Sequence, residues 1–126
     1  MPTRQPIYPG GKDTSAGAYS PGLIVGDLVF VSGQGPMNAT GDIVGDTVQE
    51  QTRQVLENVK TILAEAGCTL DDVVKSTVHI SDMGDFARFN KVYETFFNKP
   101  FPTRTTVQSV LYGFIKVEID VIAIKQ

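Results

Sequence analysis

The segment from Thr47 to Gly67 constrains the fold most, because its pattern predicts one long helix with a single apolar face. Thr47 and Glu50 have the spacing of a capping box, in which each side chain bonds the backbone of the other residue, and Gly67 suits a left-handed helix end. The stripe between them runs for about five turns and consists of Val48, Thr52, Val55, Leu56, Val59, Ile62, Leu63 and Ala66. A stripe of this length needs an apolar partner, so the helix is expected to cover a sheet.

Strands are expected on both sides of this helix in the chain. A Gly26-Asp27 turn predicts a hairpin of residues 18–25 and 28–33, and β-branched runs predict strands at 43–44, 73–80, 101–108 and 116–122. Alternation places Val74, Val78 and Ile80 on one face of the 73–80 strand. The last two strands, joined by a turn at 111–114, are expected to pair as a hairpin.

A second helix is expected to begin after the capping residues 81–85 and to stop before Pro100. Its aromatic side consists of Phe86, Phe89, Tyr93, Phe96 and Phe97. The order of elements predicts an α+β fold, a mixed β-sheet with two helices packed on one face. A small sheet covered on one side usually buries its remaining apolar area by oligomerising.

Length and composition exclude several classes of protein. The 126 residues predict one domain, with residues 1–16 as an N-terminal arm or loop and 17–126 as the single domain. The net charge of −3, without a basic block, argues against a surface built for nucleic acid. No apolar run approaches the ~20 residues of a membrane span or the core of a signal peptide, so a cytoplasmic location is expected.

The usual catalytic and metal-binding residues are scarce. Cys68 is the single cysteine, which excludes an internal disulfide and a cysteine-based metal site, and its neighbours predict an inert thiol. His79 is the single histidine and is expected to be a structural residue on the strand face opposite Val78 and Ile80. We therefore predict no metal site.

Arg104 and Glu118 are the most informative charges in the two last strands. Arg104, Thr106 and Gln108 share one strand face, which is expected to be the polar side of that strand. Glu118 lies on the polar side of the other strand, and the opposite side of each strand is expected to face the core. Either Arg104 and Glu118 are ordinary surface charges, or the planar guanidinium of Arg104 binds a carboxylate through two parallel hydrogen bonds. A hairpin register puts Glu118 opposite about Gln108. Arg104 and Glu118 are then either separated within one subunit or meet across a subunit boundary.

Longer stretches closely resemble the Rid (reactive intermediate deaminase, YjgF or RidA) family. The resemblance runs in order from about Gly17 to the C-terminus and covers residues 17–20, 29–34, 50–59, 72–75, 85–93, 101–104 and 117–119. It implies a chorismate-mutase-like fold and a homotrimer with sites in the clefts between subunits. It also implies that a 2-imino or enamine acid is hydrolysed to a 2-keto acid and ammonia without a cofactor.

The same resemblance implies the roles of individual residues. Arg104 would hold the substrate carboxylate and Glu118 would orient the attacking water. Further substrate-binding positions would be Tyr19, Ser32, Gly33, Asn90 and Thr106. The partners implied are a small imino, enamine or keto acid and further copies of the chain. Separately, the composition predicts no membrane partner and argues against nucleic acid.

Three departures from the family pattern bear on the substrate. Thr106 stands where well-studied deaminases carry cysteine, Ala18 replaces a proline, and Leu111-Tyr112-Gly113-Phe114 replaces a Leu-Pro-Lys-type loop. The alternatives are an aminomuconate-type deaminase or a trimeric ligand-binding or regulatory protein without catalysis. A ribonuclease would need phosphate contacts and an acid–base pair, for which one histidine and no basic stripe offer little support.

Overall fold

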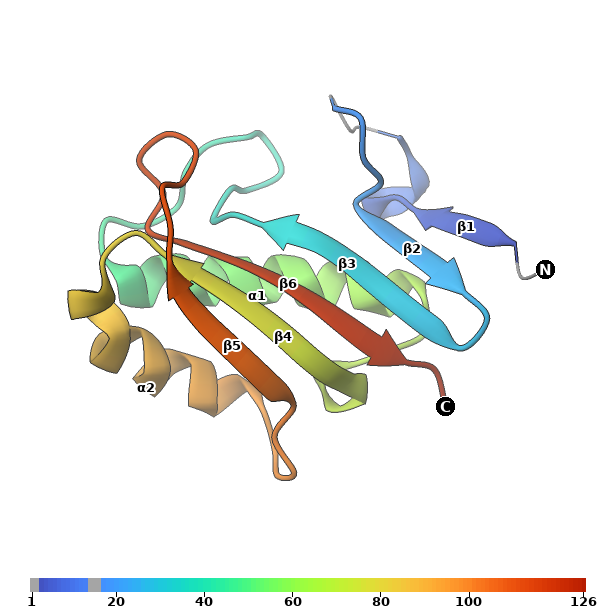
Figure 1. Cartoon of the computed structure of the whole chain (residues 1–126). Coiled ribbons are helices and arrows are strands. Elements are labelled where there is room, and N and C mark those ends of the chain that lie inside the picture. The colour runs from blue at the N-terminus through green and yellow to red at the C-terminus, as the bar shows by residue number, and fades with distance from the viewer. Residues whose placement is uncertain (1–2, 14–16) are drawn as a thin grey trace.

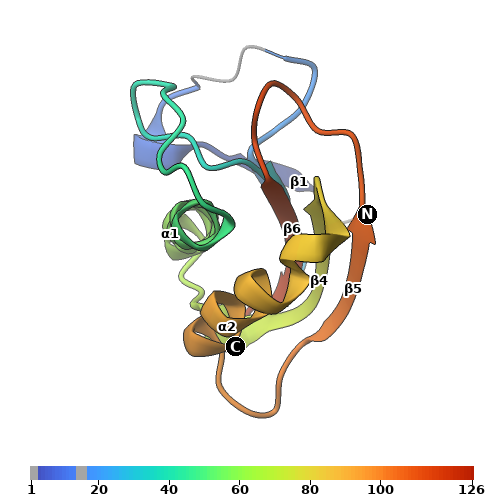
Figure 2. The same ribbon diagram turned by 90° about the vertical axis from the view of Figure 1, so that its left-hand side faces the viewer.

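The computed structural model describes residues 3–13 and 17–126, and in these residues a six-stranded sheet packs against two α-helices (Figure 1). The strands are β1 (Arg4–Ile7), β2 (Gly22–Val25), β3 (Leu28–Gln34), β4 (Val73–Ile80), β5 (Thr103–Gln108) and β6 (Val117–Ile124), and the helices are α1 (Val48–Glu65) and α2 (Phe86–Phe96). The strand order is β1-β2-β3-β6-β4-β5, in which β4 and β5 are parallel and the other neighbours antiparallel. Both helices cover the same face of the curved sheet (Figure 2), so the α+β prediction is confirmed.

Helix α1 forms for the reasons visible in its sequence. The Thr47–Glu50 capping box is present, and all the stripe residues from Val48 to Leu63 are buried. The pattern did not reveal Gln51, a buried polar residue whose amide donates to the Gly45 carbonyl at 3.0 Å and accepts from the Lys116 backbone N–H at 2.7 Å. Through Gln51 the helix holds the residue immediately before β6 in place.

Helix α2 packs its aromatic side on the sheet beside β4 and β5. Phe89 and Tyr93 are buried, and their ring centroids lie 5.4 Å apart. The Tyr93 hydroxyl hydrogen-bonds the buried Ser76 hydroxyl of β4 at 2.9 Å, so a polar bond fixes this helix against the strand.

The predicted hairpin of the last two strands is wrong, because β4 lies between β5 and β6. Ser76 of β4 is opposite Arg104 on one side and Val121 on the other, and His79 is opposite Glu118. The connection from 109 to 116 is long enough to pass over one strand. The 73–80 segment therefore lies between the two strands, and both of its edges are paired. Arg104 and Glu118 are therefore separated by a whole strand.

Three smaller differences concern the edges of the predicted elements. Ile43 and Val44 do not form a strand, since Ile43 makes only an isolated bridge with Met37. Within the predicted arm, Arg4–Ile7 pairs with β2 as an edge strand and Ile7 is buried in the core. A register shift at the start of β4 buries Val73 instead of the expected Val74, which is 42% exposed.

The sheet face opposite the helices is open in the described part of the chain. It carries polar side chains at one end, including His79, Glu118 and Asp120, which share this face because they are register neighbours. Large apolar side chains lie exposed toward the other end and at the edge of the same face: Leu28, Phe30, Val107 and Ile124.

Candidate active site

Arg104 is held against aromatic rings on the helix-covered face. Its Nη1 donates to Asn90 Oδ1 at 2.7 Å, and its guanidinium carbon lies 4.8 Å from the centroid of the Tyr93 ring. The rings of Phe86 and Phe89 are also within cation–π distance, at 5.5 and 5.8 Å. The side chain is half-buried, so it is not an ordinary solvated surface arginine.

This geometry corrects the prediction about faces. The sequence pattern placed Arg104 and Thr106 on the polar side of their strand, with core on the other side. In the structure the opposite holds, since Arg104 and Thr106 share the face of Ser76 and Val78, which the helices cover. The pattern was misleading because the apolar surface that covers Arg104 comes from α2, and β5 itself contributes little of it.

A cavity of about 300 Å³ lies beside the guanidinium. It is lined by Asn90, Tyr93, Glu94, Phe101, Pro102 and Arg104. Its size is at the lower end of the range of small-molecule sites, and its walls combine apolar surface with a few polar groups. The cavity thus has room for a small organic acid beside a cation.

Thr106, two residues along β5, carries an unsatisfied group. Its Oγ1 is buried and has no hydrogen-bond partner in the part of the chain that the structure describes. Buried hydroxyls without a partner are uncommon in folded proteins. Asn90, Arg104 and Thr106 therefore form one group of candidate residues on the helix-covered face.

Glu118 belongs to a second group, on the open face. A Cβ added to Gly33 would lie 2.6 Å from Glu118 Oε2, so the carboxylate occupies the space that a side chain at position 33 would fill. A register shift in β3 between Val31 and Gln34 accompanies this close approach.

Ser32 and Tyr19 lie next to this second group. Ser32 Oγ donates to the Ser20 carbonyl at 2.6 Å, which ties the segment of Tyr19 to the end of β3. Tyr19 itself is 58% exposed. Of the residues proposed from the sequence, the structure brings together Asn90 with Arg104 and Gly33 with Glu118, but the sheet separates Arg104 from Glu118 within one chain.

The sequence did not reveal the neighbours of Glu118. His79 is its cross-strand partner, and His79 Nδ1 forms a 2.8 Å hydrogen bond with the Ser109 hydroxyl. Asp120 also faces this side, and burial raises the pKa of its carboxyl above the usual 3.8, while the charges of His79 and Lys75 oppose that rise. A bond between residues 30 positions apart leaves no local signal in a sequence.

Replacing Asp120 with asparagine is expected to stabilise the protein at neutral pH. A carboxyl whose pKa is raised on folding favours the folded state below its unfolded pKa, and this contribution is lost as the pH rises through the folded value. The melting temperature of Asp120→Asn should therefore exceed that of the wild type at pH 7, and the difference should shrink toward pH 3.8. Thermal unfolding from pH 3.5 to 8 measures it, and a difference that grows on acidification would contradict the prediction.

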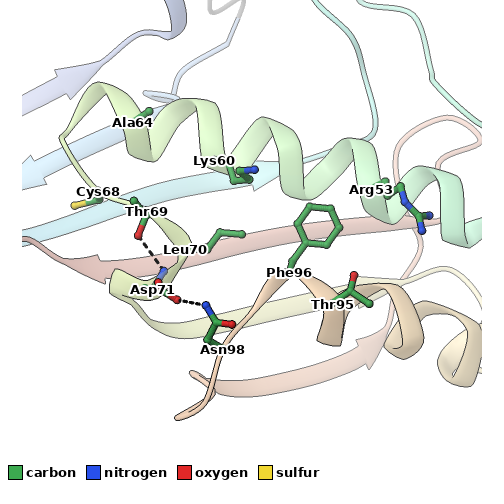
Figure 3. Close-up of a pocket in the computed structure, with 10 residues that line it drawn as sticks. All are labelled: Arg53, Lys60, Ala64, Cys68, Thr69, Leu70, Asp71, Thr95, Phe96 and Asn98. Carbon is green, nitrogen blue, oxygen red and sulfur yellow. Dashed lines mark hydrogen bonds between the residues drawn. The ribbon is translucent and has the colours of Figure 1, made fainter.

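A larger cavity, of about 590 Å³, lies between the two helices and the turn after α1 (Figure 3), and no residue of either group lines it. Arg53 and Lys60 stand along α1 above Phe96, and Asn98 donates to Asp71 at 2.9 Å at the far end. Cys68 also lines it, and burial, followed by the charge of Asp72, raises the pKa of this thiol. A thiol of this kind is a poor nucleophile, so we place the candidate site at the smaller cavity beside Arg104.

Residues 3–13 and 17–126 contain neither a cluster of candidate metal ligands nor a helix that could span a membrane. No cluster of three or more His, Cys, Asp and Glu side chains there has the arrangement of a metal site. In the same residues, neither helix has the length and apolar character needed to cross a bilayer.

Comparison with known proteins identifies the family. The family model described as Endoribonuclease L-PSP matches residues 11–125. The chain belongs to the Rid family. A RutC family protein of Saccharolobus solfataricus is 48% identical over 111 residues, which cover 86% of this chain and 88% of the relative. TdcF of Escherichia coli, provisionally named a reactive intermediate deaminase, is 45% identical over 114 residues, with the same two shares covered.

Solved structures confirm the Rid fold. The crystal structure of E. coli TdcF with bound serine superposes with a TM-score of 0.88 at 41% identity and covers 97% of this chain and 99% of that one. The E. coli YjgF structure gives a TM-score of 0.89 at 38% identity with the same coverage. The family and the chorismate-mutase-like fold expected from the sequence are thus confirmed.

Proposed function

We propose that this protein is a hydrolase that deaminates reactive 2-imino or enamine acids, such as 2-iminopropanoate and 2-iminobutanoate, to 2-keto acids and ammonia. The proposal rests on the position of Arg104. Its half-buried guanidinium is held by Asn90 and three aromatic rings beside a small cavity. A fixed guanidinium suits a planar carboxylate. The deaminase name of TdcF, a relative from the same family, supports the same reaction class.

The proposed site is shared between copies of the chain. Arg104 and Glu118 lie on opposite faces of one sheet, so a substrate held by Arg104 of one copy would meet Glu118 of another. Exposed apolar residues on the open face, such as Phe30 and Ile124, favour association through that face. A homotrimer with three equivalent clefts satisfies both requirements.

The chemistry needs one proton carrier and an oriented substrate. Water adds to the imine carbon as its proton passes to nitrogen, and a carbinolamine results. The C–N bond then breaks, the hydroxyl proton moves to the leaving nitrogen, and ammonia and the 2-keto acid are released. Glu118 would take the proton from water and return it to nitrogen. Arg104, with the Thr106 backbone amide and hydroxyl beside it, would hold the carboxylate.

Ammonia release from imines generated in situ by an amino-acid oxidase tests the proposal. The wild-type protein should accelerate hydrolysis above the spontaneous rate. An aminomuconate-type substrate, assayed beside the 2-imino acids, distinguishes a 2-imino acid deaminase from an aminomuconate-type deaminase. If no imine is hydrolysed faster while keto acids or serine, the ligand of TdcF, still bind, the protein is a ligand-binding member of the family and the proposal fails.

Replacing Gly33 with alanine is expected to reduce this activity by about tenfold to a hundredfold, because small displacements of a catalytic group are costly. The new Cβ would lie 2.6 Å from Glu118 Oε2 and displace the carboxylate. Steady-state kinetics measure the loss. In a Glu118→Gln background the same substitution should have little further effect; full additivity would show that Gly33 acts independently of Glu118.

A further inference from the structure

The connection between β5 and β6 presents an unusual amount of apolar surface. Val110, Tyr112 and Phe114 are 104%, 81% and 91% exposed, although they lie within a few residues of one another. In Figure 1 this segment is the red-orange loop that rises above the end of the sheet. Contiguous exposed apolar side chains of this kind mark binding surfaces.

The loop stands on a fixed base. Ser109 N–H donates to the Ile80 carbonyl at 2.9 Å, and Ser81 N–H donates to the Lys116 carbonyl at 3.0 Å. Ile115 is buried and anchors the end of the loop. The exposed tip is therefore presented from a base that is bonded to β4 on both sides.

A cavity of about 500 Å³ opens at this loop. Its lining is apolar on the loop side and polar at the base: Ser81, Gln108, Ser109, Val110, Leu111, Gly113, Phe114, Ile115 and Lys116. Gly113 adopts a φ of +60°, a left-handed turn conformation that favours glycine. The turn lies between Tyr112 and Phe114, the two rings of the loop.

The cavity lies at the same end of the sheet as Glu118, although Glu118 does not line it. Ser109 lines the cavity and hydrogen-bonds His79, and His79 is the cross-strand partner of Glu118. From the other side, Lys116 lines the cavity and lies two residues before Glu118 in the chain. The apolar loop thus belongs to the same end of the sheet, and to the same half of the shared site, as the carboxylate.

We propose that this loop and its cavity bind the side chain of the substrate, and that the protein prefers 2-imino acids with a large apolar or aromatic side chain. The inference rests on the proposed function. Arg104 of one copy takes the carboxylate, and Glu118 of the next faces the imine carbon. The remaining substituent extends to Phe114, which lines the cavity, and to the exposed Tyr112 ring of the same loop. An aromatic ring of the substrate that stacks on these side chains is removed from water and gains aromatic contacts.

Binding of the stable keto acid products tests this without turnover. Calorimetry with pyruvate and phenylpyruvate should show phenylpyruvate binding about tenfold more tightly or better. Phe114→Ser and Tyr112→Ser should remove most of that preference, and Phe114→Leu should keep part of it. Ile43→Ser, an exposed apolar residue outside the cavity, is the matched control and should leave it unchanged.

Three outcomes would overturn the inference. These are equal affinities for the two keto acids, no binding of either, and a smaller oligomer in Phe114→Ser with an unchanged preference. The last outcome would assign the loop to contacts between copies. The two proposals can also fail separately. If the protein hydrolyses no imine but still binds phenylpyruvate more tightly than pyruvate in a way that depends on Phe114, the proposed reaction is refuted and the binding inference stands.

Discussion

Arg104→Ala is expected to reduce kcat/KM for 2-imino acids by at least about a hundredfold, because two charge-assisted hydrogen bonds of about 1.5–3 kcal/mol each are lost. The structure makes the effect specific to this residue, since Asn90 orients the guanidinium at 2.7 Å and three aromatic rings of α2 surround it. Ammonia release at several substrate concentrations measures the loss.

Arg104→Lys is the matched control. Lysine keeps the positive charge but lacks the planar fork, so most of the activity should still be lost. Arg104→Ala loses the contacts with the rings, each worth about 0.5–2 kcal/mol, whereas the lysine ammonium can keep part of them. Circular dichroism must show that both variants remain folded. A lysine variant with wild-type kinetics would mean that a positive charge alone suffices to hold the substrate carboxylate and that the planar guanidinium has no special role.

Glu118→Gln is expected to lower kcat by about a hundredfold to ten-thousandfold, the usual contribution of a general base, with a smaller change in KM. Glutamine has the shape of glutamate and fits the space over Gly33, so the variant tests the charge and not the packing. Keto acid binding measured alongside should be largely retained.

Mixing the two inactive variants provides the sharpest test of a shared site. Co-refolded Arg104→Ala and Glu118→Gln chains form mixed assemblies in which some clefts combine an intact Arg104 with an intact Glu118 from different copies. Random mixing in a closed ring predicts recovery of about a quarter of the wild-type activity. No recovery in assemblies shown to be mixed would place both residues of each site on one chain.

The sequence predicted the local elements well and their arrangement less well, for physical reasons. Helix α1 was predictable because its cap, its stripe and its end are all local signals. The false hairpin arose because local pattern cannot show that β4 inserts between β5 and β6. Arg104 was assigned to the wrong face because the rings that cover it belong to α2, and the alternation within β5 does not show on which side that helix packs.

The resemblance supplied the candidate residues, which stay a prediction, and it did not show which of them lie together within one chain. Gly33 and Glu118 come together because a bulged strand end lies beside the start of β6. The hydrogen bond of His79 with Ser109 depends on the parallel pairing of β4 and β5, and no sequence motif predicts this pairing.

If the site is shared between copies as proposed, the sheet that stands between Arg104 and Glu118 also implies that catalysis depends on protein concentration. A solitary copy would hold a carboxylate at one face and a proton acceptor at the other, with no substrate able to reach both. Dilution below the dissociation constant of the assembly should then reduce turnover per chain while the fold persists. In a cell, the amount of protein made would set the fraction of chains that are active as well as their number.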